Sequence, residues 1–245
     1  AGDTSYPVIA QTCYRLKNGR FEQIGTAWLK HSFCAVSEPG CGDCQSTPCP
    51  TLGIGCADTY WAGLNADATA PRSEINAFTG QYEYPFTIYP TGSSSMRGKL
   101  QIREEDIEPM SGTNPDDPTH DALYFIEAQY VSFDDAEWNN QDNNASYKWI
   151  RFTSTTSAVG LSSTQVEMPA IYAWKFFDDA VDLHPVRVPD EGLLHIGSRV
   201  YDNGDGTWRY EFAVHNLNSD RSINSFTVPL GDCVSVNDVG FHDID

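Results

Sequence analysis

Positive charge is scarce in this sequence of 245 residues. Fifteen Lys and Arg residues stand against 34 Asp and Glu, which gives a formal net charge of −19 at pH 7. A field of this sign repels phosphate groups, so the composition excludes general binding to nucleic acid or to an anionic membrane surface. We therefore expect no nucleic-acid partner.

Long hydrophobic runs and export signals are also missing. No apolar run reaches the roughly 20 residues that a membrane-spanning helix needs, and the N-terminus lacks the basic and apolar regions of a signal peptide. We expect no membrane span, and a mature or trimmed form of the chain. With 40% hydrophobic and 12% aromatic residues, the sequence has enough apolar side chains to fold around a sizeable core.

Catalytic signatures are absent as well. The sequence contains no GxSxG, HExxH, P-loop or GxGxxG motif. Its six histidines stand singly, without the i, i+2 or i, i+4 spacing that places two imidazoles on one face of an element. Only His195 and His215, on neighbouring predicted strands, could form a cross-strand pair. The sequence therefore gives no positive indication of an enzyme.

Cysteine, in contrast, is plentiful, with seven residues of which six lie between positions 13 and 56. A chain this long needs no staples for its core, so the cluster indicates a loop-rich segment in an oxidising, extracellular compartment. Zinc is the alternative, but a zinc ribbon normally has two CxxC pairs and only Cys41 and Cys44 show that spacing. We predict at least two disulfides among Cys34, Cys41, Cys44, Cys49 and Cys56. Seven is an odd number, so one thiol is free, paired with another chain, or paired with a cysteine outside this sequence.

Strand patterns dominate the rest of the sequence. Asn18-Gly19 between apolar-rich arms is a strong hairpin signal, and it predicts strands over 7–16 and 21–33. Residues 122–131 alternate between apolar and polar side chains, and residues 148–153 form another short strand. Four further strands are predicted at sandwich-like spacing, over 193–201, 207–216, 223–228 and 233–244.

Helix signals are few. Ser132 followed by Asp135 predicts one capped turn that ends at Trp138, and Met168–Val181 fits a helix or a strand equally. The fold class is therefore mainly β: an antiparallel β-sandwich, elaborated or double, with a disulfide-stapled N-terminal loop region and little helix. We expect one domain over 1–245 with a Cys-rich insertion at 34–56. The alternative is a division into 1–183 and 184–245.

Oxygen ligands for a hard cation gather in three stretches. A calcium ion would reduce the repulsion between neighbouring carboxylates in 134–144, in the turn 202–206, or in the acidic stretch 104–117. A capped helical turn with a solvated loop explains the first stretch without an ion, and a plain hairpin turn explains the second. The candidate metal ligands are Asp134, Asp135, Glu137, Asp142, Asp202 and Asp205.

Several phrases of the sequence look familiar together. They are 14–25 (YRLKNGRFEQIG), 28–31 (WLKH), 52–58 (LGIGCAD), 143–147 (NNASY) and 241–245 (FHDID). In these phrases the chain resembles a group of secreted bacterial proteins that have no assigned activity. The resemblance implies export and a longer precursor, and it transfers no catalytic residue.

Two functions are compatible with these features. The first is a secreted structural, cell-surface or matrix protein, with calcium as a stabilising ion and with self-association into a homo-oligomer or filament. Strands at 6–10 and 234–245 could pair with internal strands of the same chain, or they could join neighbouring copies by strand addition. The alternative is a secreted, metal-assisted enzyme or binding module that acts on polysaccharide through carboxylates, histidines and aromatic rings that converge in space.

Overall fold

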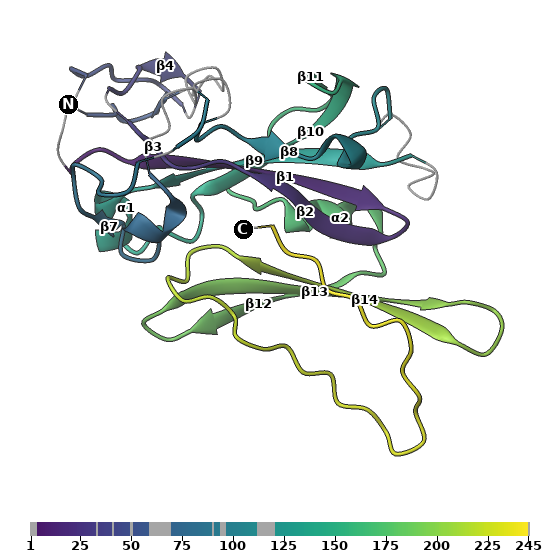
Figure 1. Cartoon of the computed structure of the whole chain (residues 1–245). Coiled ribbons are helices and arrows are strands. Elements are labelled where there is room, and N and C mark those ends of the chain that lie inside the picture. Colours follow the sequence, from purple (N-terminus) through teal and green to yellow (C-terminus); the bar gives the residue numbers. More distant parts are fainter. Residues whose placement is uncertain are drawn as a thin grey trace.

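The computed structural model describes residues 4–32, 34–40, 42–49, 51–58, 70–89, 91–93, 97–111 and 121–244. Its largest element is an antiparallel sheet of seven strands in the order β11-β10-β9-β1-β2-β8, with β3 paired to β1 (Figure 1). The strands of this main sheet are β1 (Val8–Lys17), β2 (Arg20–Thr26), β3 (Lys30–His31), β8 (Gln101–Ile102), β9 (Leu123–Val131), β10 (Ala145–Ser154) and β11 (Ser157–Gly160).

Strand β1 lies at the centre of the main sheet. It pairs with β9 from Val8 to Leu16 and with β2 from Thr12 to Lys17. The β1–β2 connection is the predicted Asn-Gly hairpin, with φ of 53° at Asn18 and 75° at Gly19. The N-terminal strand is therefore paired with strands of its own chain from Val8 onward, which is the intrachain alternative for this end of the chain.

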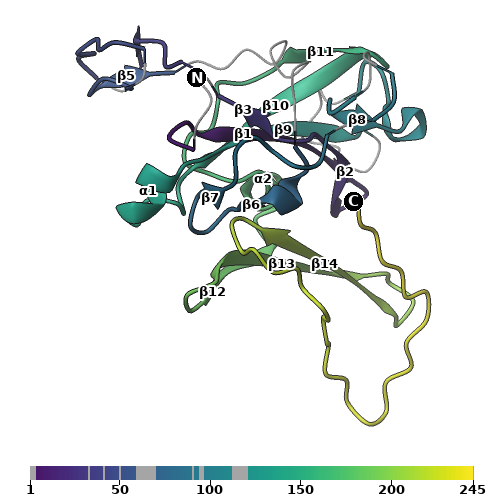
Figure 2. The same ribbon diagram turned by 60° about the vertical axis from the view of Figure 1, so that its left-hand side comes forward.

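A second, three-stranded sheet lies on one side of the main sheet, with the helix α2 (Ile171–Phe177) between them (Figures 1 and 2). Its antiparallel order is β12 (Asp182–Val188), β13 (Gly192–Asp202) and β14 (Trp208–Asn216). Met168–Val181, which fitted either type of element, contains the helix. It buries Trp174 to 1% exposure against the stacked ring of Phe21.

Side-chain alternation along β1 gives the main sheet two apolar faces. Tyr14 and Leu16 point to the α2 side and join one buried cluster with Trp174. Cys13 points the other way and packs with Tyr124 and other apolar residues in a second cluster. Val181 belongs to the first cluster and Ala213 packs against it, so buried packing joins side chains from both sides of the 183/184 boundary. These clusters place the second sheet firmly against the first.

The remaining described elements are short. They are β4 (Glu38–Pro39), β5 (Cys56–Ala57), η2 (Arg72–Glu74), β6 (Ile75–Asn76), β7 (Gln81–Tyr82), η3 (Glu104–Asp106) and α1 (Phe133–Glu137). No helix of the described residues is long and apolar enough to cross a membrane. The fold is mainly β with antiparallel sheets and little helix, as the sequence predicts.

Two disulfides staple the N-terminal loop region. Cys34 bonds to Cys49 and Cys44 bonds to Cys56, which confirms the disulfide interpretation of the cysteine cluster. The predicted participant Cys41 lies outside the described residues. Cys13 is buried as a free thiol, and its burial raises the pKa of that thiol to about 12. The other free thiol, Cys233, is exposed.

Several expectations about individual elements are wrong. Residues 223–228 and 233–244 form no strand although they are described, because they have no pairing partner among the described residues. Strand β12 was missed because Pro185 interrupts its pattern, yet proline is tolerated in an edge strand. The helical turn before Trp138 exists as α1, but the Ser132 side chain makes no capping hydrogen bond.

Gly19 provides the first prediction. A Cβ atom there would lie 2.1 Å from the Tyr201 hydroxyl of β13, whereas a Cβ at Gly204, with a similar φ of 77°, meets nothing within 4 Å. Both Gly→Ala changes place an alanine at positive φ, which lowers the free energy of unfolding by about 1 kcal/mol. Only Gly19→Ala also pushes β13 from the hairpin, which adds about 1–3 kcal/mol.

Urea unfolding of the two variants measures this difference directly. Gly19→Ala is expected to lose about 1–3 kcal/mol more free energy of unfolding than the control Gly204→Ala. Equal losses in the two variants would show that the hairpin tip does not bear on the second sheet.

Candidate functional site

The residues predicted to bind a cation fall in two separate regions. Asp134, Asp135 and Glu137 lie on the short helix α1, where partial burial raises the pKa of Asp135. Asp142, in the following loop, accepts a hydrogen bond from the Asn218 amide (2.9 Å) and forms an ion pair with Arg187. The Asp142 carboxylate therefore already has protein partners.

The second predicted region is the β13–β14 turn. Asp202 accepts a hydrogen bond from the Gly204 N–H (2.8 Å), and Asp205 accepts hydrogen bonds from the N–H (3.0 Å) and the hydroxyl (2.6 Å) of Thr207. The Thr207 hydroxyl and N–H hold the pKa of Asp205 below its ordinary value. Both carboxylates act here as turn-forming groups.

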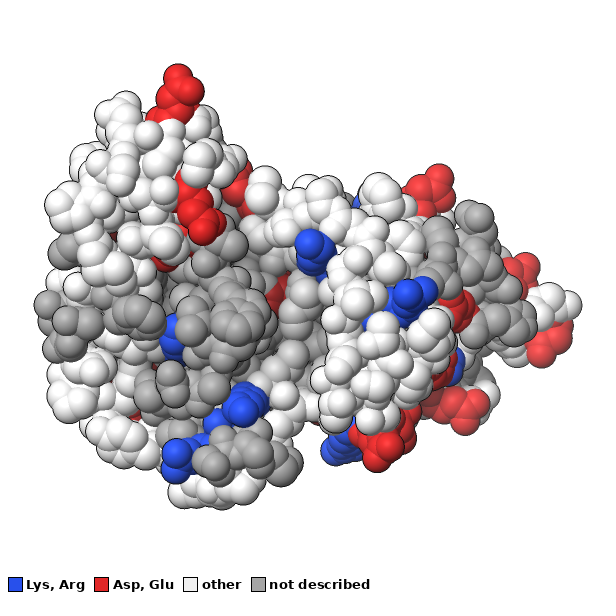
Figure 3. All heavy atoms as spheres, turned by 90° about the horizontal axis from the view of Figure 1, so that it is seen from above, with Lys and Arg blue, Asp and Glu red and all other residues white. Residues whose placement is uncertain are grey.

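Across the described part of the chain, no group of three or more His, Cys, Asp or Glu side chains is arranged to hold a metal ion. On the face seen in Figure 3, the acidic side chains are scattered in several places rather than gathered into one patch. Asp116 and Asp117 of the third acidic stretch lie outside the described residues. Calcium binding thus stays a prediction.

A buried polar cluster lies where the second sheet meets the main sheet. His195 and His215, for which the sequence allows a cross-strand pair but favours isolated histidines, are opposite each other on β13 and β14, with ring centroids 5.9 Å apart. The Nε2 atom of His215 lies 3.2 Å from a carboxylate oxygen of Glu127 on β9. All three side chains are buried, with 3%, 7% and 5% exposure. The cluster is thus a polar link inside an apolar contact.

Glu127 is well supplied with partners. The Ala170 N–H donates to its carboxylate at 2.6 Å, and the Tyr14 hydroxyl donates at 3.4 Å. Burial alone would raise the pKa of Glu127, but His215, the Ala170 N–H and Arg72 outweigh it and hold that pKa below its ordinary value. Glu127 is therefore an ionised, buried carboxylate.

His195 has fewer partners. Its Nδ1 atom is buried and has no hydrogen-bond partner among the described residues. Burial, followed by repulsion from His215, lowers the pKa of His195 to about 4. The imidazole is therefore neutral at pH 7, and it packs edge-on against the Tyr172 ring at 5.4 Å.

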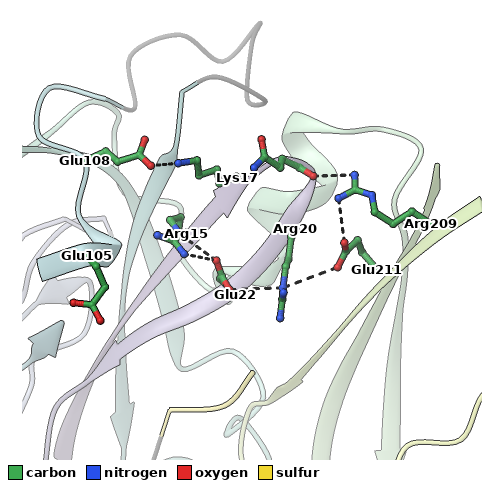
Figure 4. A pocket seen from close by; sticks show the side chains of 9 residues that line it. Arg15, Lys17, Arg20, Glu22, Glu105, Glu108, Arg209 and Glu211 are labelled. Atoms are coloured by element: carbon green, nitrogen blue, oxygen red, sulfur yellow. Dashed lines mark hydrogen bonds and ion pairs between the residues drawn. The ribbon is translucent and has the colours of Figure 1, made fainter. Parts of the chain in front are cut away.

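A charged cleft of about 460 Å³ opens beside the tip of the β1–β2 hairpin (Figure 4). Arg15 binds Glu22 across the hairpin at 2.7 Å and Asp106 at 3.2 Å, and all three side chains are at most 14% exposed. Lys17 forms an ion pair with Glu108. The cleft is lined by Arg15, Lys17, Asn18, Arg20, Glu22, Glu105, Glu108, Arg209 and Glu211.

The same cleft connects the hairpin to the second sheet. Arg209 of β14 binds Glu211 at 3.1 Å and donates to the Asn18 carbonyl at 2.9 Å, and Arg20 of β2 lies 4.0 Å from Glu211 (Figure 4). Each of the four cations that line the cleft already has a carboxylate partner. The residues of the cleft thus connect the main sheet to the second sheet. They offer little free positive charge to an anionic ligand.

Exposed apolar side chains lie along one side of the second sheet. Along β14 the side chains Arg209, Glu211 and His215 face inward, while the aromatic side chains face solvent. We call the outward side the outer apolar face. It consists of Val186, Val188, Val200, Trp208, Tyr210, Phe212 and Val214, which are 36–57% exposed.

An antiparallel sheet with one solvated face normally turns its polar side chains outward. Strand β14 departs from this pattern, because Trp208 and Tyr210 are 56% and 57% exposed. A contiguous exposed apolar patch of this kind marks an interaction surface. The outer apolar face is therefore the strongest candidate functional site of the described chain.

Sequence reasoning missed the charged cleft and the Glu127 cluster, although signals for both exist. Counting outward from the Asn-Gly turn places Arg15 opposite Glu22, which is the observed register. In the alternating segment 122–131, Glu127 is two residues after Phe125 and four after Leu123, so its side chain points to the same side of the strand. This places the Glu127 carboxylate toward the core. No local signal shows that Arg209 and Glu211 meet this hairpin.

The partly buried ion pairs of Arg15 give the second prediction. Arg15→Met leaves the Glu22 and Asp106 carboxylates without their shared cation in a poorly hydrated position, which costs about 2–4 kcal/mol of unfolding free energy. Arg221→Met is the matched control: the Arg221 side chain is 85% exposed and binds Glu191 at 3.5 Å. Its loss costs less than about 0.5 kcal/mol. Comparable urea midpoints for the two variants would contradict this account.

The pH dependence of stability gives the third prediction. The folded chain keeps His195 neutral down to about pH 4, whereas the unfolded chain protonates it near its ordinary pKa of 6.5. Stability is therefore complete above pH 6.5 and falls by on the order of 2 kcal/mol as the pH drops to 4. The lowered pKa of Glu127 extends the loss to lower pH.

Thermal unfolding between pH 7 and pH 4 tests the role of His195. His195→Phe flattens the profile between pH 6.5 and 4, because the substituted side chain cannot take up a proton in either state. The control His184→Gln removes a histidine whose side chain is 68% exposed, and it keeps the wild-type profile. A His195→Phe profile as steep as that of the wild type would overturn the assignment.

Comparison with known proteins adds no further information. No protein-family model, no curated protein sequence and no solved structure matches this chain. The function has to be inferred from the chemistry and geometry of the chain itself.

Proposed function

We propose that this chain is a secreted, extracellular structural or cell-surface protein that acts by associating with further copies of itself. The observation that carries the proposal is the outer apolar face of the second sheet. Seven apolar side chains that alternate along β12, β13 and β14 remain at least 36% exposed there. Burying such side chains is worth about 25 cal/mol per Å² of apolar surface, which is a strong drive toward association.

The disulfides support the extracellular location. Cys34–Cys49 and Cys44–Cys56 hold a segment that contributes few side chains to the buried clusters. Bonds of this kind persist in oxidising surroundings and are rare in a reducing cytosol. A structural or surface role uses such stability, because the protein then works outside the reach of cellular repair.

The net charge sets the conditions for association. Two copies that each carry −19 repel one another until salt screens the charge. At about 0.1 M ionic strength the Debye length is about 10 Å, and it shortens as salt is added. The expected behaviour is an assembly favoured by salt, with calcium as an additional stabilising ion if carboxylates such as Asp134 and Asp135 bind it.

Light scattering coupled to size-exclusion chromatography provides the test and the fourth prediction. The purified protein is expected to shift from monomer toward dimer or larger species as NaCl rises from about 50 mM to 500 mM, and further when calcium replaces a chelator. A strict monomer at high salt, both with calcium and with chelator, would overturn the proposed function.

A further inference from the structure

We propose that the segment between residues 219 and 241, here called the C-terminal arm, covers the outer apolar face of a second copy of this chain. The exchange is reciprocal, so that each copy gives an arm and receives one. This inference rests on the proposed self-association and names the surface and the segment that carry it. The evidence lies in the chemistry of the arm, in its anchoring and in one contact that it already makes.

The arm has the composition of a strand but lacks a partner. Within the described residues, 222–243 make one backbone–backbone hydrogen bond, from the Val234 N–H to the Gly231 carbonyl. Its apolar side chains are exposed: Leu230, Val234 and Val236 are 56%, 57% and 50% accessible. Apolar side chains exposed in this way are available to a partner surface.

Both ends of the arm are held to the body of the protein. At its start, the Asn218 amide donates to the Gln141 carbonyl (3.0 Å), and the Arg221 N–H donates to Glu191 (2.9 Å). At its end, the His242 imidazole donates to the Gln23 carbonyl (2.7 Å) on β2. Between these anchors the arm, drawn in yellow, loops outward on the side of the second sheet that faces away from α2 (Figures 1 and 2).

One contact shows which surface suits the arm. The Phe226 ring lies 5.1 Å from the ring of Phe212, which belongs to the outer apolar face. Apolar residues continue at every second position through Val228 and Leu230, and this is the period at which a strand presents one face. Val228 and Leu230 are 40% and 56% exposed, so these later side chains are accessible for the same kind of contact on another molecule.

Symmetry makes the exchange self-consistent. The arm and the outer apolar face are on the same side of the molecule (Figure 1). When two copies meet through these sides about a two-fold axis, each arm is brought to the face of the other copy. In this arrangement the alternate apolar side chains of an extended segment pack on the apolar side chains of the face.

The experiment uses two single variants of the full chain. Tyr210→Asp damages the face and Leu230→Asp damages the arm. These side chains are 57% and 56% exposed, so both variants are expected to fold. The matched control is Trp138→Asp, which places the same charge at a 77% exposed aromatic position beyond α1. Circular dichroism melting verifies that all three variants are folded.

At a salt concentration where the wild type associates, Tyr210→Asp and Leu230→Asp are each expected to raise the dissociation constant at least tenfold, and Trp138→Asp leaves it unchanged. An equimolar mixture of the two weak variants then recovers a heterodimer, because one intact arm meets one intact face. Sedimentation velocity with one variant fluorescently labelled measures this recovery.

The outcomes separate the two levels of the proposal. If the wild type associates but neither variant weakens it, another surface mediates assembly, and the arm exchange is wrong while the proposed function stands. If only Tyr210→Asp weakens it, the two faces pack directly on one another, and the arm exchange is wrong. If both variants weaken it but their mixture stays monomeric, the intact arm does not meet the intact face, and the arm exchange is again wrong. A wild type that is monomeric at high salt overturns the proposed function together with this inference.

Discussion

The burial of Trp174 between the two sheets is the contact on which the rest of the structure depends. Its ring stacks on Phe21 of the main sheet at a centroid distance of 6.3 Å. On the other side it approaches Gly197 of β13 so closely that a Cβ there would lie 3.0 Å from the ring. A large side chain faces a glycine, which allows the second sheet to pack near the main sheet. The Glu127–His215 contact and the charged cleft then form around this position.

The orientation of the second sheet explains why its aromatic side faces outward. Its inner side has to meet a hairpin tip that carries Arg15, Arg20 and Glu22, and Arg209 and Glu211 match these charges. Because side chains alternate along β14, a polar inner side places Trp208, Tyr210 and Phe212 on the opposite side. The outward position of these aromatic side chains thus accompanies the contacts of Arg209 with the Asn18 carbonyl and of Glu211 with Arg20 on the inner side of β14.

The sequence predicted much of the fold and little of the site. Local patterns identified the Asn18-Gly19 hairpin, the alternating strand that became β9, and the disulfide region around Cys34 to Cys56, because each depends on neighbours in the chain. The arm at 219–241 reads as strands for the same reason, yet strand formation also needs a pairing partner, and the described chain provides none. Strand β12 shows the converse: Pro185 argues against a strand locally, but pairing with β13 imposes one.

Composition and local pattern by themselves determined the acidic character, the disulfide-stapled loop and the mainly antiparallel β fold. These properties depend on residue types and on side-chain period, which a sequence displays directly. Only the tertiary structure decided that His195 faces His215 beside Glu127, that Arg209 reaches the hairpin tip, and that the apolar side of β14 faces solvent. Each of these contacts joins residues that are distant in sequence, and their meeting is fixed by how the sheets pack around Trp174.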